Sequence, residues 1–359
     1  MKLAYISRAT LYTSPGGDTT QLDETAANLR EMGVEVDIYL ASDTIDYSKY
    51  DLLHFFNIIR PADVIKHIKL SRKPYLVSTI FVEYGAVKEK PTGIKGIVQS
   101  LVSESMLDYI KVIARAVKNG ERIVSKEYLW MGQVGSIRYV ANNAAMLLPN
   151  SESEYRRFSN KYNINKPYHV IPNGINIDMV SRSYPADEKH KDAILCMGRI
   201  ETRKNQLALI RALNNTQYKL FIYGKPSPNN MAYYEQCKAE AGPNVFIPGE
   251  LKGDALYTAY ANAKVHVLPS YFETTGLSSL EAAAMGCNIV VTDKGDTRDY
   301  FKNDAWYCEP DDVASIKQAV DDAFNAPYDT GFRQRIMDNY TWKRAAEETL
   351  AAYKQVLKV

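Results

Sequence analysis

Residues 268–286 read LPSYFETTGLSSLEAAAMG, and this stretch predicts a buried strand, a short loop and a helix. The apolar run ends at Pro269, Glu273 lies in the loop, and Thr274 or Thr275 can cap a helix that ends at Gly286. The start of a helix offers unbonded backbone amides and the positive end of the helix dipole, which together suit a diphosphate. The stretch therefore predicts a strand–helix unit with an anion site; an ordinary capped helix is the alternative.

The same alternation of apolar runs and helical patterns extends over most of the 359 residues. It is typical of α/β proteins with parallel sheets, helices on both faces and ligands at the carboxyl ends of the strands. The predicted strands cover residues 3–7, 34–40, 52–56, 75–80, 146–148, 169–171, 193–197, 219–223, 245–247, 265–268 and 288–292. The predicted helices cover residues 21–32, 204–213, 231–241, 254–263, 276–285 and 342–357, and a capping box opens a further helix at Ser151.

This length favours two domains. The boundary is predicted after Pro172, because a polar and charged stretch follows it. We therefore expect a first domain over residues 1–172, a second over 173–340, and a C-terminal helix over 341–359 that packs back on the first domain. Residues 84–139 lack a strand pattern and carry apolar residues at helical spacing, which predicts a helical insertion in the first domain.

Composition narrows the class of protein. With 44 basic and 42 acidic residues the formal net charge is only +2, which argues against nucleic acid as a partner. The four cysteines are scattered, without zinc-ligand spacing, which fits a reducing compartment. The N-terminus is too quickly polar for a signal peptide, and no apolar run approaches the ~20 residues that span a bilayer. We expect a cytoplasmic protein that can still rest on the inner face of a membrane.

A second stretch, residues 197–206, reads MGRIETRKNQ and also joins a strand to a helix. Gly198 permits close backbone approach, while Arg199 and Lys204 place two cations at the carboxyl end of the strand. Glu281 lies roughly 8–9 Å along the helix from its start. One extended ligand could thus place a sugar near Glu273, phosphates at the helix start and a ribose near Glu281. A solvated turn is the alternative for the two cations.

The order of these motifs resembles that of glycosyltransferase family 4, a family with the two-Rossmann-domain GT-B fold. Gly198-Arg199 and Lys204 precede Glu273 and Glu281, which stand in a Glu-x7-Glu pattern. Five weaker matches lie in the same order along the chain: residues 14–17 with Gly16 and Gly17, 149–151, 171–176, 245–249 with Pro248, and 340–342 with Tyr353.

The resemblance implies retaining transfer of a sugar from a nucleoside diphosphate, UDP or GDP, across a cleft between the domains. Arg199 and Lys204 would neutralise the diphosphate, Glu273 would contact the sugar, and Glu281 the ribose. The other implied donor contacts are Gly16, Gly17, Gly198, Pro248, Thr274, Thr275, Gly276 and Leu277. The acceptor would be a glycan, a lipid-linked group or another hydroxyl, in cell-surface polysaccharide or glycolipid synthesis. The resemblance implies no tightly bound cofactor and no metal, and the chain has no Asp-x-Asp metal motif.

One position departs from the family. Many members carry a histidine after the fourth strand, where this chain has Phe81. Glu83 could replace that histidine as a base or acceptor contact, or could be a salt-bridging residue at a helix start. His54 ends another strand at the same edge and could line the acceptor side, but a hydrogen-bonded structural histidine fits equally well.

A row of basic residues, Lys111, Arg115, Lys118, Arg122 and Lys126, lies inside the predicted insertion. Lys111, Arg115 and Lys118 share a helical face, which predicts either attraction to an anionic acceptor or membrane or a solvated face.

The sequence also bears on two other classes of protein. An NAD-dependent oxidoreductase needs a Gly-x-Gly-x-x-Gly fingerprint, which is absent after residues 3–7 and 193–197. A non-catalytic, degenerate nucleotide-sugar-binding protein remains an alternative, because the family histidine is missing.

Overall fold

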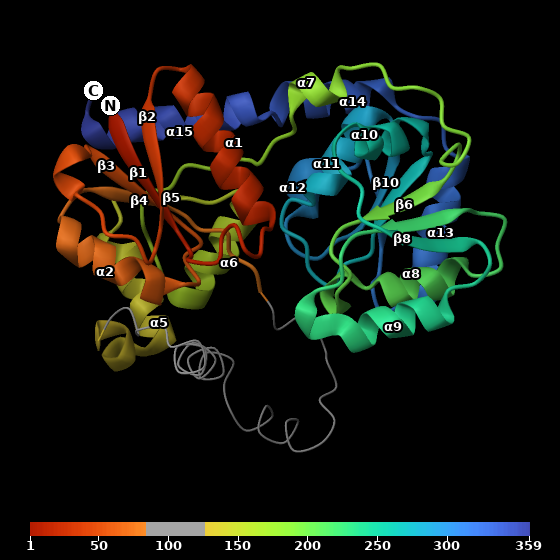
Figure 1. Ribbon diagram of the computed structural model, residues 1–359, viewed down its shortest axis with the longest axis horizontal. Helices are drawn as coiled ribbons and strands as arrows, with labels where there is room; N and C mark the ends of the chain where they lie inside the picture. Colours follow the sequence, from red (N-terminus) through yellow and green to blue (C-terminus); the bar gives the residue numbers. More distant parts are fainter. Residues whose placement is uncertain (84–125) are drawn as a thin grey trace. The chain divides into compact units, whose positions relative to one another are not determined.

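The computed structural model describes residues 1–83 and 126–359, which divide into two compact units (Figure 1). The first unit holds residues 1–81, 126–172 and 345–359, and the second holds residues 82–83 and 173–344. Each unit is built around one parallel sheet, so the predicted class, α/β with two parallel sheets, is confirmed.

The first unit contains five parallel strands in the order β2-β1-β3-β4-β5. The strands are β1 Lys2–Ser7, β2 Glu35–Leu40, β3 Leu52–Phe56, β4 Tyr75–Ser78 and β5 Met146–Leu148. Helices α2, α5 and α6 pack together on one side, and α1 and α15 lie on the other (Figure 1). Their bounds are α1 Gly17–Glu31, α2 Pro61–Ser71, α5 Lys126–Asn143, α6 Glu152–Tyr162 and α15 Trp342–Leu357, with a short 3-10 helix at Tyr47–Lys49.

The second unit contains six parallel strands in the order β11-β10-β9-β6-β7-β8. They are β6 Ile194–Met197, β7 Leu220–Tyr223, β8 Val245–Gly249, β9 Val265–Leu268, β10 Asn288–Thr292 and β11 Trp306–Cys308. Helices α8, α9 and α13 form one packed group, and α7, α10, α11 and α14 are linked through α11 into another. The helices are α7 Ile177–Val180, α8 Gln206–Leu213, α9 Met231–Glu240, α10 Gly253–Asn262, α11 Leu277–Met285, α12 Thr297–Phe301, α13 Val313–Asn325 and α14 Thr330–Asn339, with 3-10 helices at Thr202–Lys204 and Pro228–Asn230.

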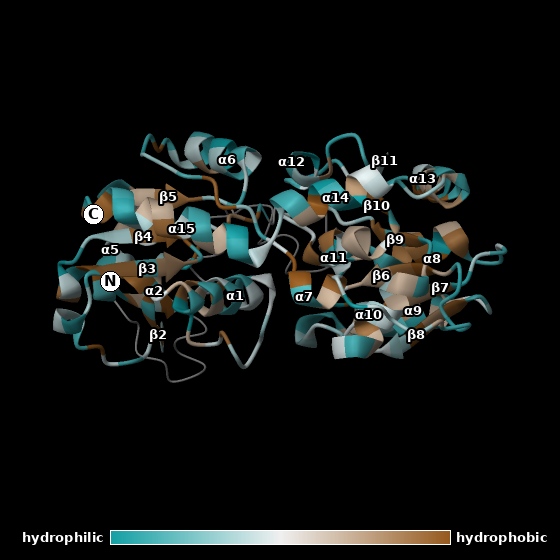
Figure 2. Ribbon diagram, turned by 90° about the horizontal axis from the view of Figure 1, so that it is seen from above, coloured by the Kyte–Doolittle hydropathy of each residue, from teal (hydrophilic) through white to brown (hydrophobic). Residues whose placement is uncertain are grey.

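Apolar strands dictate both cores. Strands β3, β4, β6, β7, β9 and β10 are buried along their whole length, as expected for parallel strands covered on both faces. Figure 2 shows most strands in brown, the colour of apolar residues, and much of the helical surface in teal. The predicted capping box at Ser151 is confirmed, because the Ser151 hydroxyl accepts a hydrogen bond from the amide of Glu154.

The structure corrects the predicted strand over residues 169–171. These residues lie beside β5 and donate two backbone hydrogen bonds, from the His169 amide to Leu147 O in β5 and from the Ile171 amide to Pro149 O just after it. They form no named strand, because prolines at 167 and 172 remove amide donors on both sides. Of the predicted insertion, residues 126–139 belong to α5, which is kinked at Gly132. The remainder lies outside the described residues.

Strand order in the second unit creates the site. β9 pairs with β6, although β7 and β8 come between them in sequence. From β6 the chain first builds outward through β7 and β8, and it then returns to the other side of β6. A sheet that reverses direction in this way leaves room for a ligand beyond the carboxyl ends of the two central strands.

Within residues 1–83 and 126–359, no helix combines the length and the apolar character needed to cross a bilayer.

Candidate active site

The two predicted motif stretches meet beyond the carboxyl ends of β6 and β9. The Ser278 hydroxyl, in the first turn of α11, donates to Met197 O at 3.0 Å. The Tyr271 amide donates to Arg203 O at 2.9 Å. The Arg203 guanidinium donates to Phe272 O at 2.7 Å. These contacts hold residues 197–204 against residues 271–278.

Lys204 and Glu273 form the charged centre of this site. The Lys204 ammonium donates to Glu273 Oε2, and both side chains are largely buried. Ser270 donates to the same oxygen at 3.3 Å, and Arg203 Nη1 lies 3.9 Å from it. Burial alone would raise the pKa of Glu273, but the charges of Lys204 and Arg203 and the hydrogen bonds from Lys204 and Ser270 hold it below its usual value. Glu273 is therefore a buried carboxylate that stays ionised.

The backbone of Glu273 is fixed by a segment that the sequence analysis did not single out. Its amide donates to Lys294 O at 3.0 Å, and its carbonyl accepts from the Asp296 amide at 2.9 Å. Gly295 lies between them with φ of 105°, and a Cβ there would stand 2.0 Å from Glu273 O. Only glycine allows this approach, so Gly295 positions Glu273. Arg203 was also missed, because its role depends on a contact between the segments that follow β6 and β9. Ser270 was missed although it lies only three residues before Glu273.

Helix α11 begins with an uncapped turn. Its N-cap is Gly276 with φ of 68°, so no side chain caps the helix; the prediction that Thr274 or Thr275 would do so is wrong. Thr275 is buried and bonds to Asn173 Nδ2 at 2.9 Å and to Tyr300 OH at 3.2 Å. Ser279 donates the first bond of the helix, to Gly276 O, so the amides of Leu277 and Ser278 precede the helical ladder.

The other predicted donor residues of the second unit lie around this turn. Gly198 faces Lys204, whose Cε lies 3.7 Å from where a Gly198 Cβ would be. The Arg199 side chain is exposed, and its carbonyl accepts from Gln206. Glu281 is half-buried in α11, with Tyr257 OH 3.5 Å away, while Thr274 is half-buried and Pro248 is exposed at the end of β8. The structure therefore joins Lys204 to Glu273, whereas the Arg199 side chain is exposed to solvent.

A buried histidine that the sequence analysis overlooked lies behind the site. His266, in β9, has its Nδ1 3.2 Å from Ser279 Oγ, in the first turn of α11, and its buried Nε2 has no hydrogen-bond partner. Burial, helped by the charge of Lys204, lowers the pKa of His266 to about 3, so the ring is neutral. A single histidine in an apolar strand carried no signal for this role.

The predicted site residues of the first unit lie at a helix start or in the core of that unit. Gly16 and Gly17 lie at the start of α1. His54 is buried with both ring nitrogens bonded, to Tyr353 OH at 2.6 Å and Ser78 Oγ at 2.9 Å, which fits the structural alternative. Phe81 is buried against Phe158 and Tyr162, so the position matched to the family histidine points into the core.

Three further candidates remain. Glu83 is half-buried within the second unit. Lys111 and Arg115 lie outside the described residues.

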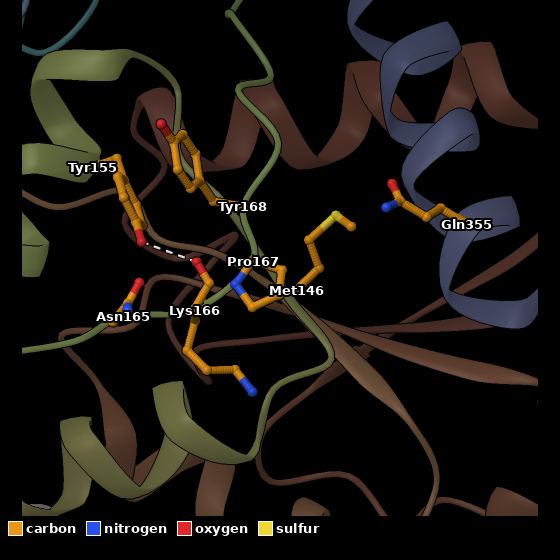
Figure 3. Close-up of a pocket in the computed structure, with 7 residues that line it drawn as sticks. All are labelled: Met146, Tyr155, Asn165, Lys166, Pro167, Tyr168 and Gln355. Atoms are coloured by element: carbon orange, nitrogen blue, oxygen red, sulfur yellow. Dashed lines mark hydrogen bonds between the residues drawn. The ribbon is translucent and has the colours of Figure 1, made fainter.

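The hollow in Figure 3 belongs to the first unit and contains none of the predicted site residues. Its volume is about 630 Å³, and it lies beside β5 and α15, where Tyr155 stacks on Tyr168 at 3.6 Å between ring centres. The lining residues are Met146, Tyr155, Asn165, Lys166, Pro167, Tyr168 and Gln355.

The geometry agrees with comparisons to known proteins. The family model described as glycosyl transferases group 1 matches residues 181–341. This part of the chain is similar to the group 1 glycosyltransferases. The matched region contains Lys204, Glu273, Gly295 and the whole of α11.

Individual relatives support the same family. An uncharacterized glycosyltransferase of Methanocaldococcus jannaschii is 33% identical over 190 residues, which is 48% of this chain and 46% of that protein. The chain spans about half the length of the curated relatives it matches.

Solved structures show that the fold covers the whole chain. A sucrose-phosphate synthase of Thermosynechococcus elongatus superposes with a TM-score of 0.75 at 16% identity over 100% of both chains. The Anabaena protein HepE, solved with UDP-glucose, gives 0.64 at 14% identity over 100% of this chain and 98% of that one. The chain thus has the GT-B fold of two parallel-sheet units, as predicted.

Proposed function

We propose that this protein is a retaining glycosyltransferase that moves a sugar from a nucleoside-diphosphate sugar, UDP- or GDP-linked, to a hydroxyl acceptor. The observation that carries the proposal is the joined Lys204–Glu273 pair beside the uncapped start of α11. Cations and unbonded amides at one point suit a diphosphate, and a buried ionised carboxylate beside them suits the polar face of a sugar.

The proposed reaction breaks the bond between the anomeric carbon and the diphosphate oxygen. Negative charge then develops on the leaving diphosphate, where Lys204, Arg199 and the amides of Leu277 and Ser278 would stabilise it. The acceptor hydroxyl forms the new bond to the anomeric carbon and gives its proton to a base, the role predicted for Glu83. Because the leaving group is stabilised by fixed charges, it departs as an anion and needs neither a protonating acid nor a metal.

The roles of the remaining residues are part of the proposal. Glu273 would hold the donor sugar, and Glu281 the ribose, four residues into α11 beyond Leu277. Pro248 would lie beside the nucleobase, and Gly198, Thr274 and Gly276 would border the donor. Thr275 would act through its bonds to Asn173 and Tyr300. Gly16 and Gly17 as donor contacts, and Glu83 as the base, stay predictions.

The acceptor and the cellular setting are also proposed. A glycan or lipid-linked acceptor, within polysaccharide or glycolipid synthesis, follows from the resemblance to family 4. The cytoplasm is proposed because all four cysteines are free and buried, as expected in a reducing compartment. We also propose peripheral contact with the inner face of an anionic membrane, because the sequence has a row of basic residues that includes Lys111 and Arg115.

The first test is nucleotide binding. Thermal unfolding is followed with UDP, GDP and NAD, and then a panel of nucleotide sugars is screened for slow hydrolysis. We expect stabilisation by UDP or GDP and none by NAD. Stabilisation by NAD alone would overturn the proposal, and nucleotide binding without hydrolysis or transfer would favour the degenerate nucleotide-sugar-binding protein.

The second test is the variant Glu273→Gln. We expect it to lower kcat for donor hydrolysis by about 10²-fold or more, while nucleotide stabilisation is retained. The matched control is Glu188→Gln, because Glu188 is an exposed glutamate of the same unit that pairs with Lys191. If Glu273→Gln hydrolysed the donor with the kcat of the wild type, Glu273 would have no role in the reaction.

A further inference from the structure

Helices α2 and α5 of the first unit present large apolar side chains to solvent. Trp130, in α5, is 93% exposed, the highest value for a large apolar residue in the described part of the chain. Leu70, at the end of α2, is 61% exposed, and Leu129 is 39% exposed. Scattered exposed apolar residues are ordinary, but an almost fully exposed tryptophan next to others marks an interaction surface.

These side chains belong to one continuous surface. The Lys69 ammonium lies 2.6 Å from Glu127 Oε1, which joins the end of α2 to the start of α5. Leu70 follows Lys69 directly, and Trp130 lies three residues after Glu127 on the same helical face. Figure 1 shows the two helices side by side, and they pack together.

The C-terminal end of α2 is positively charged. Residues 66–73 read KHIKLSRK and contain four cations and no carboxylate. Lys66, Lys69 and Leu70 are spaced to share one face of α2, and Arg72 and Lys73 follow at its end. Glu127 neutralises Lys69, which leaves Lys66, Arg72 and Lys73 around the exposed apolar pair. We call Lys66, Lys69, Leu70, Arg72, Lys73 and Trp130 the α2–α5 patch.

We propose that the α2–α5 patch docks on an anionic lipid surface, with Trp130 and Leu70 inserted among the head groups and the cations against lipid phosphates. Tryptophan has an apolar body and a polar N–H, which suits the boundary between acyl chains and water. Basic residues next to inserted apolar side chains add attraction to anionic lipids. The inference gives the proposed membrane contact a surface of its own, and it does not depend on the transfer reaction.

Charge favours lipid over a second copy of the chain as the occupant. A two-fold interface would bring the same patch face to face, so Lys66, Arg72 and Lys73 of both copies would repel each other. Lysine is also depleted in the buried centres of protein interfaces. An anionic membrane complements the same cations.

The experiment uses the full chain and vesicles of phosphatidylcholine with or without phosphatidylglycerol. Flotation at low and high salt measures the partition coefficient. We expect binding to the anionic vesicles that weakens with salt, and little binding to phosphatidylcholine alone. Trp130→Ser and Leu70→Ser should each weaken binding by about tenfold, because each removes an inserted apolar side chain. The control is Met231→Ser, since Met231 is 46% exposed on α9 of the second unit.

The charges are tested separately. Lys66→Gln and Arg72→Gln should each weaken binding by about fivefold and reduce its salt dependence. Lys219→Gln, a change at an exposed lysine of the second unit, should leave binding unchanged. Trp130→Phe should keep most of the binding but lose the vesicle-induced blue shift of tryptophan emission, since the other tryptophans, Trp306 and Trp342, are half-buried and buried.

Several results would overturn the proposal. The first is that the wild-type protein does not bind anionic vesicles. The second is that Trp130→Ser binds them as strongly as the wild type does. A dimer that Trp130→Ser converts to monomers would assign the patch to a second copy. Shielding of Trp130 from acrylamide in the free protein would show that another part of the chain covers it. Nucleotide stabilisation is measured in the same variants, so a failure of the proposed transferase function is distinguished from a failure of docking.

Discussion

Helix α1 in the first unit and helix α11 in the second both follow a central strand of a parallel sheet, yet their first turns carry opposite chemistry. α1 has Asp18 in its first turn, and Asp18 Oδ1 accepts from the Thr19 amide at 3.0 Å. α11 has no acidic residue in its first turn and no side-chain cap. The start of α1 is occupied by the chain's own carboxylate, whereas no side-chain carboxylate occupies the first turn of α11, where we propose that the diphosphate binds.

The nearby cations differ in the same way. Arg8 is buried at the end of β1 and makes five hydrogen bonds, to both carboxylate oxygens of Asp18, to the carbonyl and hydroxyl of Thr10 and to Ser14 O. Its guanidinium is paired with Asp18 and holds one loop in place. In the second unit Lys204 has one carboxylate partner and Arg199 is exposed. Of two similar strand–helix units, one has its cation paired within its own loop, and the other is the unit for which we propose ligand binding.

The largest expected effect is on activity in the second unit. Lys204→Ala should lower kcat/KM for donor turnover by about 10²- to 10³-fold, because the leaving diphosphate loses a fixed cation. Steady-state kinetics with the best nucleotide sugar measure it, and circular dichroism checks the fold. Lys219→Ala, at an exposed lysine of the same unit, is the control. A kcat/KM close to that of the wild type would contradict the proposed role of Lys204 in donor turnover.

The matching change in the first unit should affect stability instead. Arg8→Ala leaves the half-buried carboxylate of Asp18 without its cation, so we expect a loss of about 3 kcal/mol in the free energy of unfolding. Urea unfolding measures it, and the double variant Arg8→Ala/Asp18→Ala should recover part of the loss. UDP or GDP affinity should stay unchanged. A fall in affinity without a fall in stability would assign anion binding to the start of α1 as well.

A buried histidine in each unit provides a pH test. Burial lowers the pKa of His54 and of His266 to about 3, below the usual 6.5. As the pH falls below 6.5, the unfolded chain takes up protons that the folded chain does not, so stability is lost until the folded pKa is reached. Each histidine should cost about 1.6 kcal/mol between pH 6.5 and 5, because the unfolded ring is already half protonated at pH 6.5.

Urea unfolding at these two pH values measures that loss. His54→Gln and His266→Gln should each reduce the pH-dependent part by one histidine's share. We also expect His266→Gln to lower donor turnover more than His54→Gln, because only His266 contacts the first turn of α11. Equal pH dependence in wild type and variants would show that folding does not lower the pKa of these rings.

The smallest effect comes from making α11 resemble α1. Ser278→Asp places a carboxylate at the second position of α11, where α1 has Asp18. Ser278→Asp and Ser278→Asn both lose the hydrogen bond from the Ser278 hydroxyl to Met197 O, so the two variants are compared with each other. Relative to Ser278→Asn, the helix dipole should stabilise the carboxylate of Ser278→Asp by up to about 1 kcal/mol, and the added charge should weaken UDP or GDP binding by about tenfold. Isothermal titration and thermal unfolding measure the two terms. Ser278→Asn is the uncharged control. Equal nucleotide affinity in both variants would show that the diphosphate does not bind at this turn.

Local pattern was enough to predict the elements around the site. Leucines and valines in short runs predict β9 over residues 265–268 and β10 over 288–292, and both match the structure. β11 was missed, because Trp306–Cys308 is a strand of only three residues without a distinct apolar run. The alternation with helices predicts parallel sheets because parallel neighbours need a crossover. The capping failure at Thr274 and Thr275 arose because Gly276 adopts a left-handed conformation that no sequence periodicity reveals.

By itself, the sequence determined the two-sheet α/β class, the strand–helix units and the presence of Lys204 and Glu273 in separate loops, since these depend on residues close together in the chain. Only the tertiary structure decided that β9 lies against β6, and so that Lys204 meets Glu273, that Gly295 fixes its backbone and that Arg8 is consumed by its own loop. Strand order is set by how whole sheets bury their apolar faces, and no local pattern encodes which strands become neighbours.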